Sequence, residues 1–195
     1  MRVHSGLTVA LALVLTSCVP PESAHPLSAP ESAKADKRLS GLFTSHLDGV
    51  LVTLELVPKT GALVDLVLTG TDKDKGASVL AFEAFPTMLA GKSYLNLRAK
   101  TFKGPYADGA EVAEKYIFAK YEFGKDGALT LAIMEEEPVK AAIDAKKLAG
   151  TAGERALQLT ASSEELAAFV QGADAKVLFR KFAVFRKIAS VVERR

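Results

Sequence analysis

The sequence has few of the residues from which compact catalytic or metal sites are usually built. Its 195 residues include a single cysteine, Cys18, and three histidines. One cysteine excludes an internal disulfide, so the fold has to be held together by its hydrophobic core. Acidic and basic side chains nearly balance, with a formal net charge of +2. That balance gives no electrostatic basis for binding nucleic acid.

The N-terminal residues have the three-part layout of a secretory signal peptide. A weakly basic start precedes the uncharged apolar run 7–15, which is too short to span a bilayer because a spanning helix needs roughly 20 residues. The motif Leu15-Thr16-Ser17-Cys18 resembles a bacterial lipobox. The resemblance implies a signal peptide at 1–17, cleavage before Cys18, and acylation of both the Cys18 sulfur and the new amino terminus, which together give stable anchoring. The alternative is an ordinary signal peptide with a chance cysteine.

The residue after the lipobox bears on location. Val19 stands where aspartate would favour retention in the inner membrane. The resemblance therefore implies a protein of the bacterial cell envelope, anchored in the outer membrane and facing the periplasm.

Beyond the motif, composition divides the chain into three parts. Residues 18–37 are rich in Pro, Ser and Ala and lack an apolar period, which predicts a disordered tether. Residues 38–189 are long enough for one domain with a sizeable core. Residues 190–195 form a basic tail. The basic side chains from Arg180 onward suit either anionic headgroups or a solvated edge strand with a frayed end.

Alternation of apolar and polar residues predicts that the domain is mainly β. Strand-like segments occur at 50–56, 64–68, 79–85, 94–99, 116–123, 129–133, 157–159 and 182–188. Pro86 is expected to close the third of these, and Gly124-Lys125-Asp126-Gly127 is typical of a hairpin turn. About eight or nine strands in meander order are best accommodated by one antiparallel barrel, because closure removes the sheet edges.

The pattern changes after residue 134, where two short helices are expected near the C-terminal end. Glu135-Glu136-Glu137-Pro138 begins the first, since acidic residues suit the helix dipole and proline fits the first helical position. The three glutamates have a second interpretation as paired carboxylates, but the helix start explains them. Gly150 ends this helix. Ser162 followed by Glu165 is a capping box for the second helix.

Residues at both ends of the domain resemble lipocalin-like, calycin-type β-barrels. Arg38-Leu39-Ser40-Gly41-Leu42-Phe43 opens the first strand where that family has Gly-x-Trp, and the basic Arg186 lies on the last strand. The segment 72–98 also resembles uncharacterised bacterial lipoproteins that carry such a domain. The resemblance implies a barrel whose end aromatic, Phe43, is crossed by Arg186 in a cation–π contact. It implies no assigned activity.

One segment has a partial metal-binding pattern. Asp72, Asp74 and Glu83 stand at positions 1, 3 and 12 of an EF-hand-like calcium loop. Gly76 and Ala77 depart from the pattern at positions 5 and 6, and two lysines in the loop would repel the ion. A solvated turn is the preferred interpretation, so no metal is expected.

Two further patterns have a chemical interpretation and a simpler one. Tyr116 and Lys120 have the Tyr-x-x-x-Lys spacing of short-chain dehydrogenases, but in a strand their side chains lie about 13 Å apart. His46, the only histidine of the predicted domain, has the chemistry of a general base. No nucleophile motif accompanies it, so a hydrolase would require His46 to meet an acid and a hydroxyl in space. We therefore expect no catalytic residue.

The expected function is that of a membrane-anchored envelope lipoprotein whose barrel binds a small apolar ligand or lipid without a cofactor. Barrels of about eight strands either fill their interior with side chains or hold one small ligand. An interior packed throughout by Leu, Val and Phe would argue against such a ligand. The alternative is a non-catalytic envelope scaffold or assembly protein that docks a protein partner through its outer face or the loop 86–91.

Overall fold

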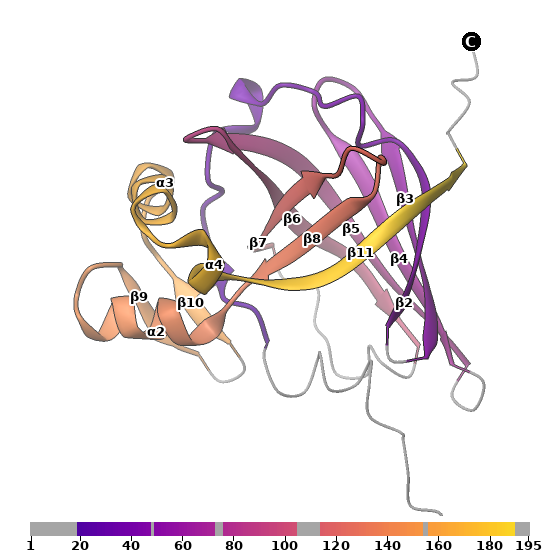
Figure 1. Ribbon diagram of the computed structural model, residues 1–195. Helices are drawn as coiled ribbons and strands as arrows, with labels where there is room; N and C mark the ends of the chain where they lie inside the picture. Colours follow the sequence, from indigo (N-terminus) through magenta and orange to yellow (C-terminus); the bar gives the residue numbers. More distant parts are fainter. Residues whose placement is uncertain (1–18, 48, 73–75, 105–113, 154–155, 190–195) are drawn as a thin grey trace, which may run out of the picture.

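Eight antiparallel strands close into a single barrel (Figure 1). The computed structural model describes residues 19–47, 49–72, 76–104, 114–153 and 156–189. The barrel strands are β2 (Gly41–Leu47), β3 (Val50–Pro58), β4 (Val64–Asp72), β5 (Gly76–Leu89), β6 (Lys92–Lys103), β7 (Tyr116–Phe123), β8 (Leu129–Met134) and β11 (Phe179–Ala189). Strands β2 to β8 follow in meander order, and β11 closes the circle by pairing with both β8 and β2. The predicted fold class, a mainly β antiparallel barrel, is confirmed.

Because the strands run up and down, their connections alternate between two ends of the barrel. The last residues of β2, β4 and β6 lie at the end of the barrel drawn lowest in Figure 1, which we call the lower end. The connections after β3, β5 and β7 lie at the opposite, upper end. Strand β11 begins at the lower end and finishes at the upper end. The upper end is closed by a segment described below, and the candidate site lies toward the lower end.

Strand β5 is longer than the sequence predicts. It was expected to stop before Pro86 but continues to Leu89. Pro86 pairs with Leu95 of β6, whereas the described pairing of β5 with β4 extends no further than Ala84. Beyond that point β5 is an edge strand, where the missing N–H of proline removes no ladder bond.

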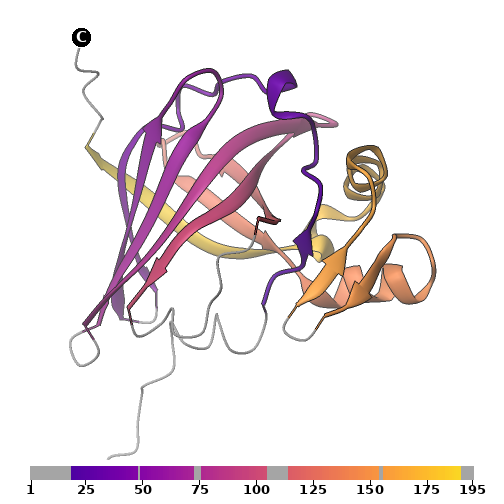
Figure 2. The ribbon, with the colours of Figure 1, turned by 180° about the vertical axis from the view of Figure 1, so that it is seen from behind.

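The segment between β8 and β11 forms a small layer of helices and strands outside the barrel wall (Figures 1 and 2). It contains α2 (Glu136–Asp144), β9 (Gly150–Ala152), β10 (Leu157–Leu159), α3 (Ser163–Gly172) and α4 (Ala175–Leu178). An apolar cluster joins this layer to the outer faces of β6, β7, β8 and β11. It combines Tyr94, Phe118, Met134 and Phe179 of the barrel with Val139, Leu159, Leu166 and Val170 of the layer.

Two of the three helices in this layer were predicted. The capping box of α3 is present, because Ser162 accepts from the Glu165 backbone N–H while the Glu165 carboxylate accepts from the Ser162 N–H. Helix α2 differs in detail: Pro138 is its third residue rather than its first, and the helix ends at Asp144, before Gly150. The third helix, α4, has four residues, too few for a periodic pattern to reveal.

The prediction of a disordered tether at 18–37 is wrong for the described residues of that segment. Strand β1 (Glu22–Ser23) pairs in parallel with β10, and Ser23 also pairs with Tyr116 at the start of β7. From the lower end the chain then runs along the outside of the barrel to the upper end (Figure 2). The ordered structure therefore starts well before residue 38. We call residues 19–40 the strap.

Candidate functional site

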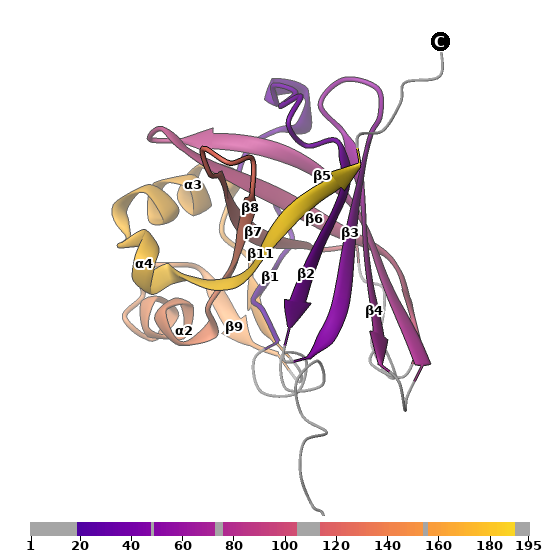
Figure 3. The ribbon, with the colours of Figure 1, turned by 45° about the vertical axis from the view of Figure 1, so that its right-hand side comes forward.

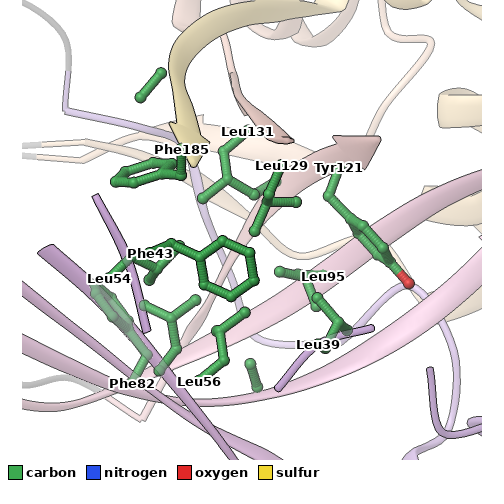
Figure 4. Close-up of a cluster of buried hydrophobic side chains, with 14 of the residues drawn as sticks. Leu39, Phe43, Leu54, Leu56, Phe82, Leu95, Tyr121, Leu129, Leu131 and Phe185 are labelled. Atoms are coloured by element: carbon green, nitrogen blue, oxygen red, sulfur yellow. The ribbon is translucent and has the colours of Figure 1, made fainter. Parts of the chain in front are cut away.

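Apolar side chains pack the middle of the barrel from inward-facing positions of all eight strands. Phe43, Leu54, Leu95, Leu129 and Phe185 are each at most 1% exposed. Figure 4 shows these side chains pointing toward one another across the interior. A ligand that ran through the whole barrel would have to displace them, so this part of the interior is core.

A second set of inward-facing apolar side chains, toward the lower end, is only partly buried. Each of them packs against the buried core yet keeps some contact with solvent. They come from seven different strands and are Leu47, Leu68, Leu80, Phe102, Ile117, Ile133 and Phe182. We call these seven residues the half-buried group.

Three members of the half-buried group are cross-strand neighbours, and two others lie at the lower ends of their strands. Leu80 pairs with both Leu68 and Phe102. Leu47 is the last residue of β2, and Ile117 is the second residue of β7. The group therefore lines part of the barrel interior toward the lower end.

Strands β11 and β2 separate toward this end (Figure 3). Their pairing is confined to Arg186, Lys187 and Ala189 of β11. Among the described residues, 179–185 of β11 pair with β8 alone, and 45–47 of β2 pair with β3 alone. Two register shifts in β11 accompany the separation, as expected because bulges bend and twist a strand. Leu47 of β2 and Phe182 of β11, two members of the half-buried group, thus lie on the strand segments that do not pair with each other.

The strap closes the upper end. Leu39 is 1% exposed and belongs to the barrel core. The Tyr121 hydroxyl donates to Asp36 Oδ2 at 3.0 Å, and Arg38 Nη2 donates to the same oxygen at 2.7 Å. The Arg38 guanidinium also lies over the Phe123 ring, 4.8 Å from its centroid. One short segment therefore supplies an apolar plug and a polar fastening.

These contacts shift the pKa values of both titratable partners. The hydrogen bond from Arg38 is the largest cause that lowers the pKa of Asp36 below its ordinary value. Burial, followed by the negative charge of Asp36, raises the pKa of Tyr121 to about 12. At neutral pH the carboxylate is ionised and the phenol keeps its proton, which are the states that the hydrogen bond requires.

The expected contact between Arg186 and Phe43 is not formed. Lys187 lies over the Phe43 ring instead, with its Nζ 5.6 Å from the ring centroid. The two residues pair on the β11–β2 ladder, so their side chains face the same way. Arg186 is one residue out of phase, and its guanidinium pairs with Asp126 at 3.4 Å.

A buried polar cluster holds the strap against the barrel wall. Asn96 Oδ1 accepts the Leu27 N–H at 2.7 Å, and Asn96 Nδ2 donates to Thr87 Oγ1 at 2.8 Å and to the Phe85 carbonyl at 3.3 Å. The Ser28 hydroxyl lies 2.6 Å from Thr87 Oγ1. This cluster was not predicted, because Asn96 has the spacing of an outward polar residue and only the distant strap buries it.

The residues of the EF-hand-like pattern do not come together. Asp72 pairs with Gly76 at the end of the β4–β5 ladder, and Glu83 lies seven residues further along β5. That spacing corresponds to roughly 23 Å along a strand. Asp74 lies outside the described residues, among which no cluster suited to a metal is found. Glu83 instead forms ion pairs with three bases, Lys59, Arg98 and Lys100.

The other candidate residues also lie apart. His46 is exposed and is paired on the ladder with Leu51 of β3. Tyr116 and Lys120 lie on β7, a strand, as the sequence interpretation assumed. Lys120 forms an ion pair with Glu122 on the same strand. By the alternation of their strands, the side chains of these residues face away from the interior that the half-buried group lines.

The charged segments near the end of the chain have structural partners. Glu135 occupies the N-cap position of α2 without a side-chain capping hydrogen bond, and its carboxylate pairs with Arg180 Nε at 2.7 Å. One of the three consecutive glutamates and one of the C-terminal basic residues noted in the sequence are therefore partners in an ion pair. The signal segment 1–17, Cys18 and the tail 190–195 lie outside the described residues.

Within the described part of the chain, large exposed apolar side chains are few and lie on separate elements. Met88, near the tip of the β5–β6 hairpin within the expected docking loop 86–91, is 73% exposed. Leu51, Val177 and Ile188 are also exposed. Single exposed side chains of this kind are ordinary on protein surfaces and do not define a docking face.

Comparison with protein-family models, with curated proteins and with solved structures found no match to this chain. None of the described helices is long and apolar enough to cross a bilayer. The eight-stranded antiparallel barrel is compatible with a lipocalin-like fold.

Proposed function

We propose that this protein is a lipid-anchored bacterial envelope lipoprotein whose lipocalin-like barrel binds the hydrocarbon part of a small ligand at its lower end. The half-buried group is the observation that carries the proposal. Seven inward-facing apolar side chains retain contact with solvent there, although the same residue types are fully buried nearby. Apolar surface left in water costs about 25 cal/mol per Å², and a bound hydrocarbon chain would remove that cost.

The composition of the half-buried group supports a hydrocarbon ligand. It consists of Leu, Ile and Phe alone and presents no ionisable side chain. Transferring a charged or strongly polar group onto such a surface is unfavourable, so the polar part of the ligand stays outside the barrel. The proposed activity is binding, with no catalytic step and no cofactor.

The anchor rests on the sequence motif. Leu15-Thr16-Ser17-Cys18 supports diacylation of the Cys18 sulfur and a location at the outer membrane, facing the periplasm. Several acyl chains on one residue give stable attachment, because a single chain binds a bilayer only marginally. Mass spectrometry of the protein from its bacterial host would test this step: a mature chain that starts at Cys18 and carries acyl mass supports it, and an unmodified Cys18 overturns it.

The ligand step is tested by affinity across a series of chain lengths. The chain from residue 19 onward, which keeps every described residue, is titrated with fatty acids of increasing length in competition with a fluorescent fatty acid. Each added methylene that reaches the half-buried group contributes about 0.8 kcal/mol, which is about fourfold in affinity, until the chain outgrows the group. Affinity that does not change with length, or no binding, would overturn the proposal and favour the docking of a protein partner.

Two neighbouring residues offer a matched pair of variants. Leu80 faces inward in the half-buried group, and Val79 is also half-buried but faces outward on the same strand. Leu80→Glu is expected to weaken binding of the longest fatty acid at least tenfold, since a carboxylate on this surface costs well over 1.4 kcal/mol. Val79→Glu is expected to leave it unchanged. Equal affinities in two folded variants would contradict the assignment.

A further inference from the structure

The strap fixes where the chain leaves the barrel. Pro21 and Ser23 are buried, and Ser23 pairs with Tyr116 at the start of β7. Residue 116 adjoins Ile117 of the half-buried group, so the first described residues of the chain lie at the lower end. Figures 1 and 2 view the molecule from opposite sides, and both show the strap reaching this end.

Little chain remains between this exit and the lipobox cysteine. Cys18 precedes the buried Pro21 by three positions, and three extended residue steps span about 10 Å. A strand of nine residues such as β3, tilted as barrel strands are, gives a barrel height of roughly 23 Å. An anchor on Cys18 therefore reaches the lower end but not the upper end, unless the strap is peeled from the wall.

Peeling the strap would disrupt buried contacts. Leu27 is 2% exposed, and its N–H is bound by Asn96 in a buried cluster. Ser23 is fully buried, and Leu39 plugs the upper end of the barrel. These contacts hold the exit at the lower end in the folded protein.

We infer that the lower end of the barrel lies against the lipid bilayer, and that the half-buried group takes up acyl chains of bilayer lipids directly from it. This inference rests on the proposed anchor at Cys18 and on the proposed ligand class. The uncovered hydrocarbon of the barrel and the exit toward the anchor lie at the same end, whereas the upper end is closed by Leu39 and by the Asp36–Tyr121 hydrogen bond. An acyl chain enters the barrel without crossing water.

The orientation is tested with two exposed apolar residues at opposite ends of the barrel. Leu51, opposite His46 near the β2–β3 connection, is 44% exposed at the lower end, and Met88 is 73% exposed at the upper end. In the acylated full-length protein the Cys18 thiol is consumed, so a cysteine introduced by Leu51→Cys or Met88→Cys is the single free thiol. Each variant is labelled with a fluorophore on phosphatidylcholine vesicles that contain a headgroup-spin-labelled lipid. Quenching is expected to be several-fold stronger at residue 51, and equal or reversed quenching overturns the orientation.

The entry of acyl chains is tested at the half-buried group itself. A fluorophore on Leu47→Cys is exposed to vesicles whose lipids carry the spin label at the end of the acyl chain. Quenching that falls several-fold in the additional variant Leu80→Glu, and remains in Val79→Glu, supports entry. Quenching that is absent, or unchanged by Leu80→Glu, overturns it. If the half-buried group is filled by something other than a bilayer lipid, such as the acyl chains on Cys18, the quenching is likewise absent or unchanged by Leu80→Glu.

The two proposals fail separately. If fatty acids bind to the chain from residue 19 onward but residue 51 is not quenched preferentially, the inferred orientation is wrong and the ligand site stands. If residue 51 is quenched preferentially but fatty acids do not bind, the proposed ligand site is wrong and the barrel only rests on the bilayer.

Discussion

Replacing Asn96 by leucine should release the strap from the barrel wall. Asn96 is fully buried and is the only asparagine in the sequence. Its Oδ1 is the acceptor for the Leu27 N–H, and its Nδ2 donates to Thr87 and to the Phe85 carbonyl. Leucine has a similar volume, so the variant removes the hydrogen bonds and creates no large cavity.

The expected loss follows from the groups left without a partner. The buried Leu27 N–H loses its acceptor, which costs about 1–3 kcal/mol. Thr87 keeps the Ser28 hydroxyl as a partner, so its contribution is smaller. We expect Asn96→Leu to lower the free energy of unfolding by about 2 kcal/mol, roughly a thirtyfold change in the folding equilibrium.

Urea unfolding followed by far-ultraviolet circular dichroism measures this change, since the chain has no tryptophan. Thr53→Leu, a polar-to-leucine change on the outer face of β3, serves as the control and should stay within about 0.5 kcal/mol. Deleting residues 19–28 should cost less in the Asn96→Leu background than in the wild type, by about 1–2 kcal/mol. A change in Asn96→Leu no larger than in the control, or additive effects of the deletion, would refute the role of Asn96 as the fastening of the strap.

Three further predictions concern groups away from this cluster. The pKa of Asp36 is lowered, chiefly by the Arg38 hydrogen bond. The stabilising effect of the Asp36 carboxylate should therefore be full above the ordinary pKa of about 4 and disappear as pH falls through the lower folded value. In urea unfolding, the free energies of wild type and Asp36→Asn should become equal at acid pH, and a difference that stays constant with pH would contradict this. Because the pKa of Tyr121 is raised to about 12, an ultraviolet titration should show a late-ionising tyrosine that Tyr121→Phe removes, and an unchanged curve would count against the burial of that phenol. Ser162→Ala should cost about 1 kcal/mol of stability through loss of the capping box, whereas Ser163→Ala, the next residue, should cost little; equal losses would show that the cap contributes nothing.

The elements that were predicted correctly are those whose signal is local. The alternation from Val50 to Leu56 identifies β3, because burial on one face of a strand recurs every second residue. Ser162 and Glu165 identify the start of α3, because both partners of the capping box lie within one turn. Barrel closure also followed, from the number of strands and the cost of open edges.

Features that depend on register could not be predicted from the pattern. Leu54 and Leu68 have the same local alternation and pair directly on the β3–β4 ladder, yet Leu54 is fully buried and Leu68 is not, because burial depends on which side chains from other strands pack against each of them. Whether Arg186 or Lys187 faces Phe43 is likewise a matter of one residue of register. Bulges in β11 shift the phase of that strand, and no composition rule places a bulge.

The strap was missed for a different reason, and its order changes what an anchor at Cys18 would do. A free segment of about 20 residues has an end-to-end distance of about 25 Å, similar to the height of the barrel, so a barrel on such a tether would present either end to the bilayer. With the chain bound from Pro21 onward, three residues remain, and their reach of about 10 Å is less than half of that height. The contacts that bind the strap join it to strands about 60 to 90 residues away in the sequence, such as Leu27 to Asn96 and Asp36 to Tyr121. Composition alone therefore predicts a linker. Whether the anchor only localises the barrel or also orients it therefore depends on long-range contacts that a Pro- and Ser-rich segment does not reveal.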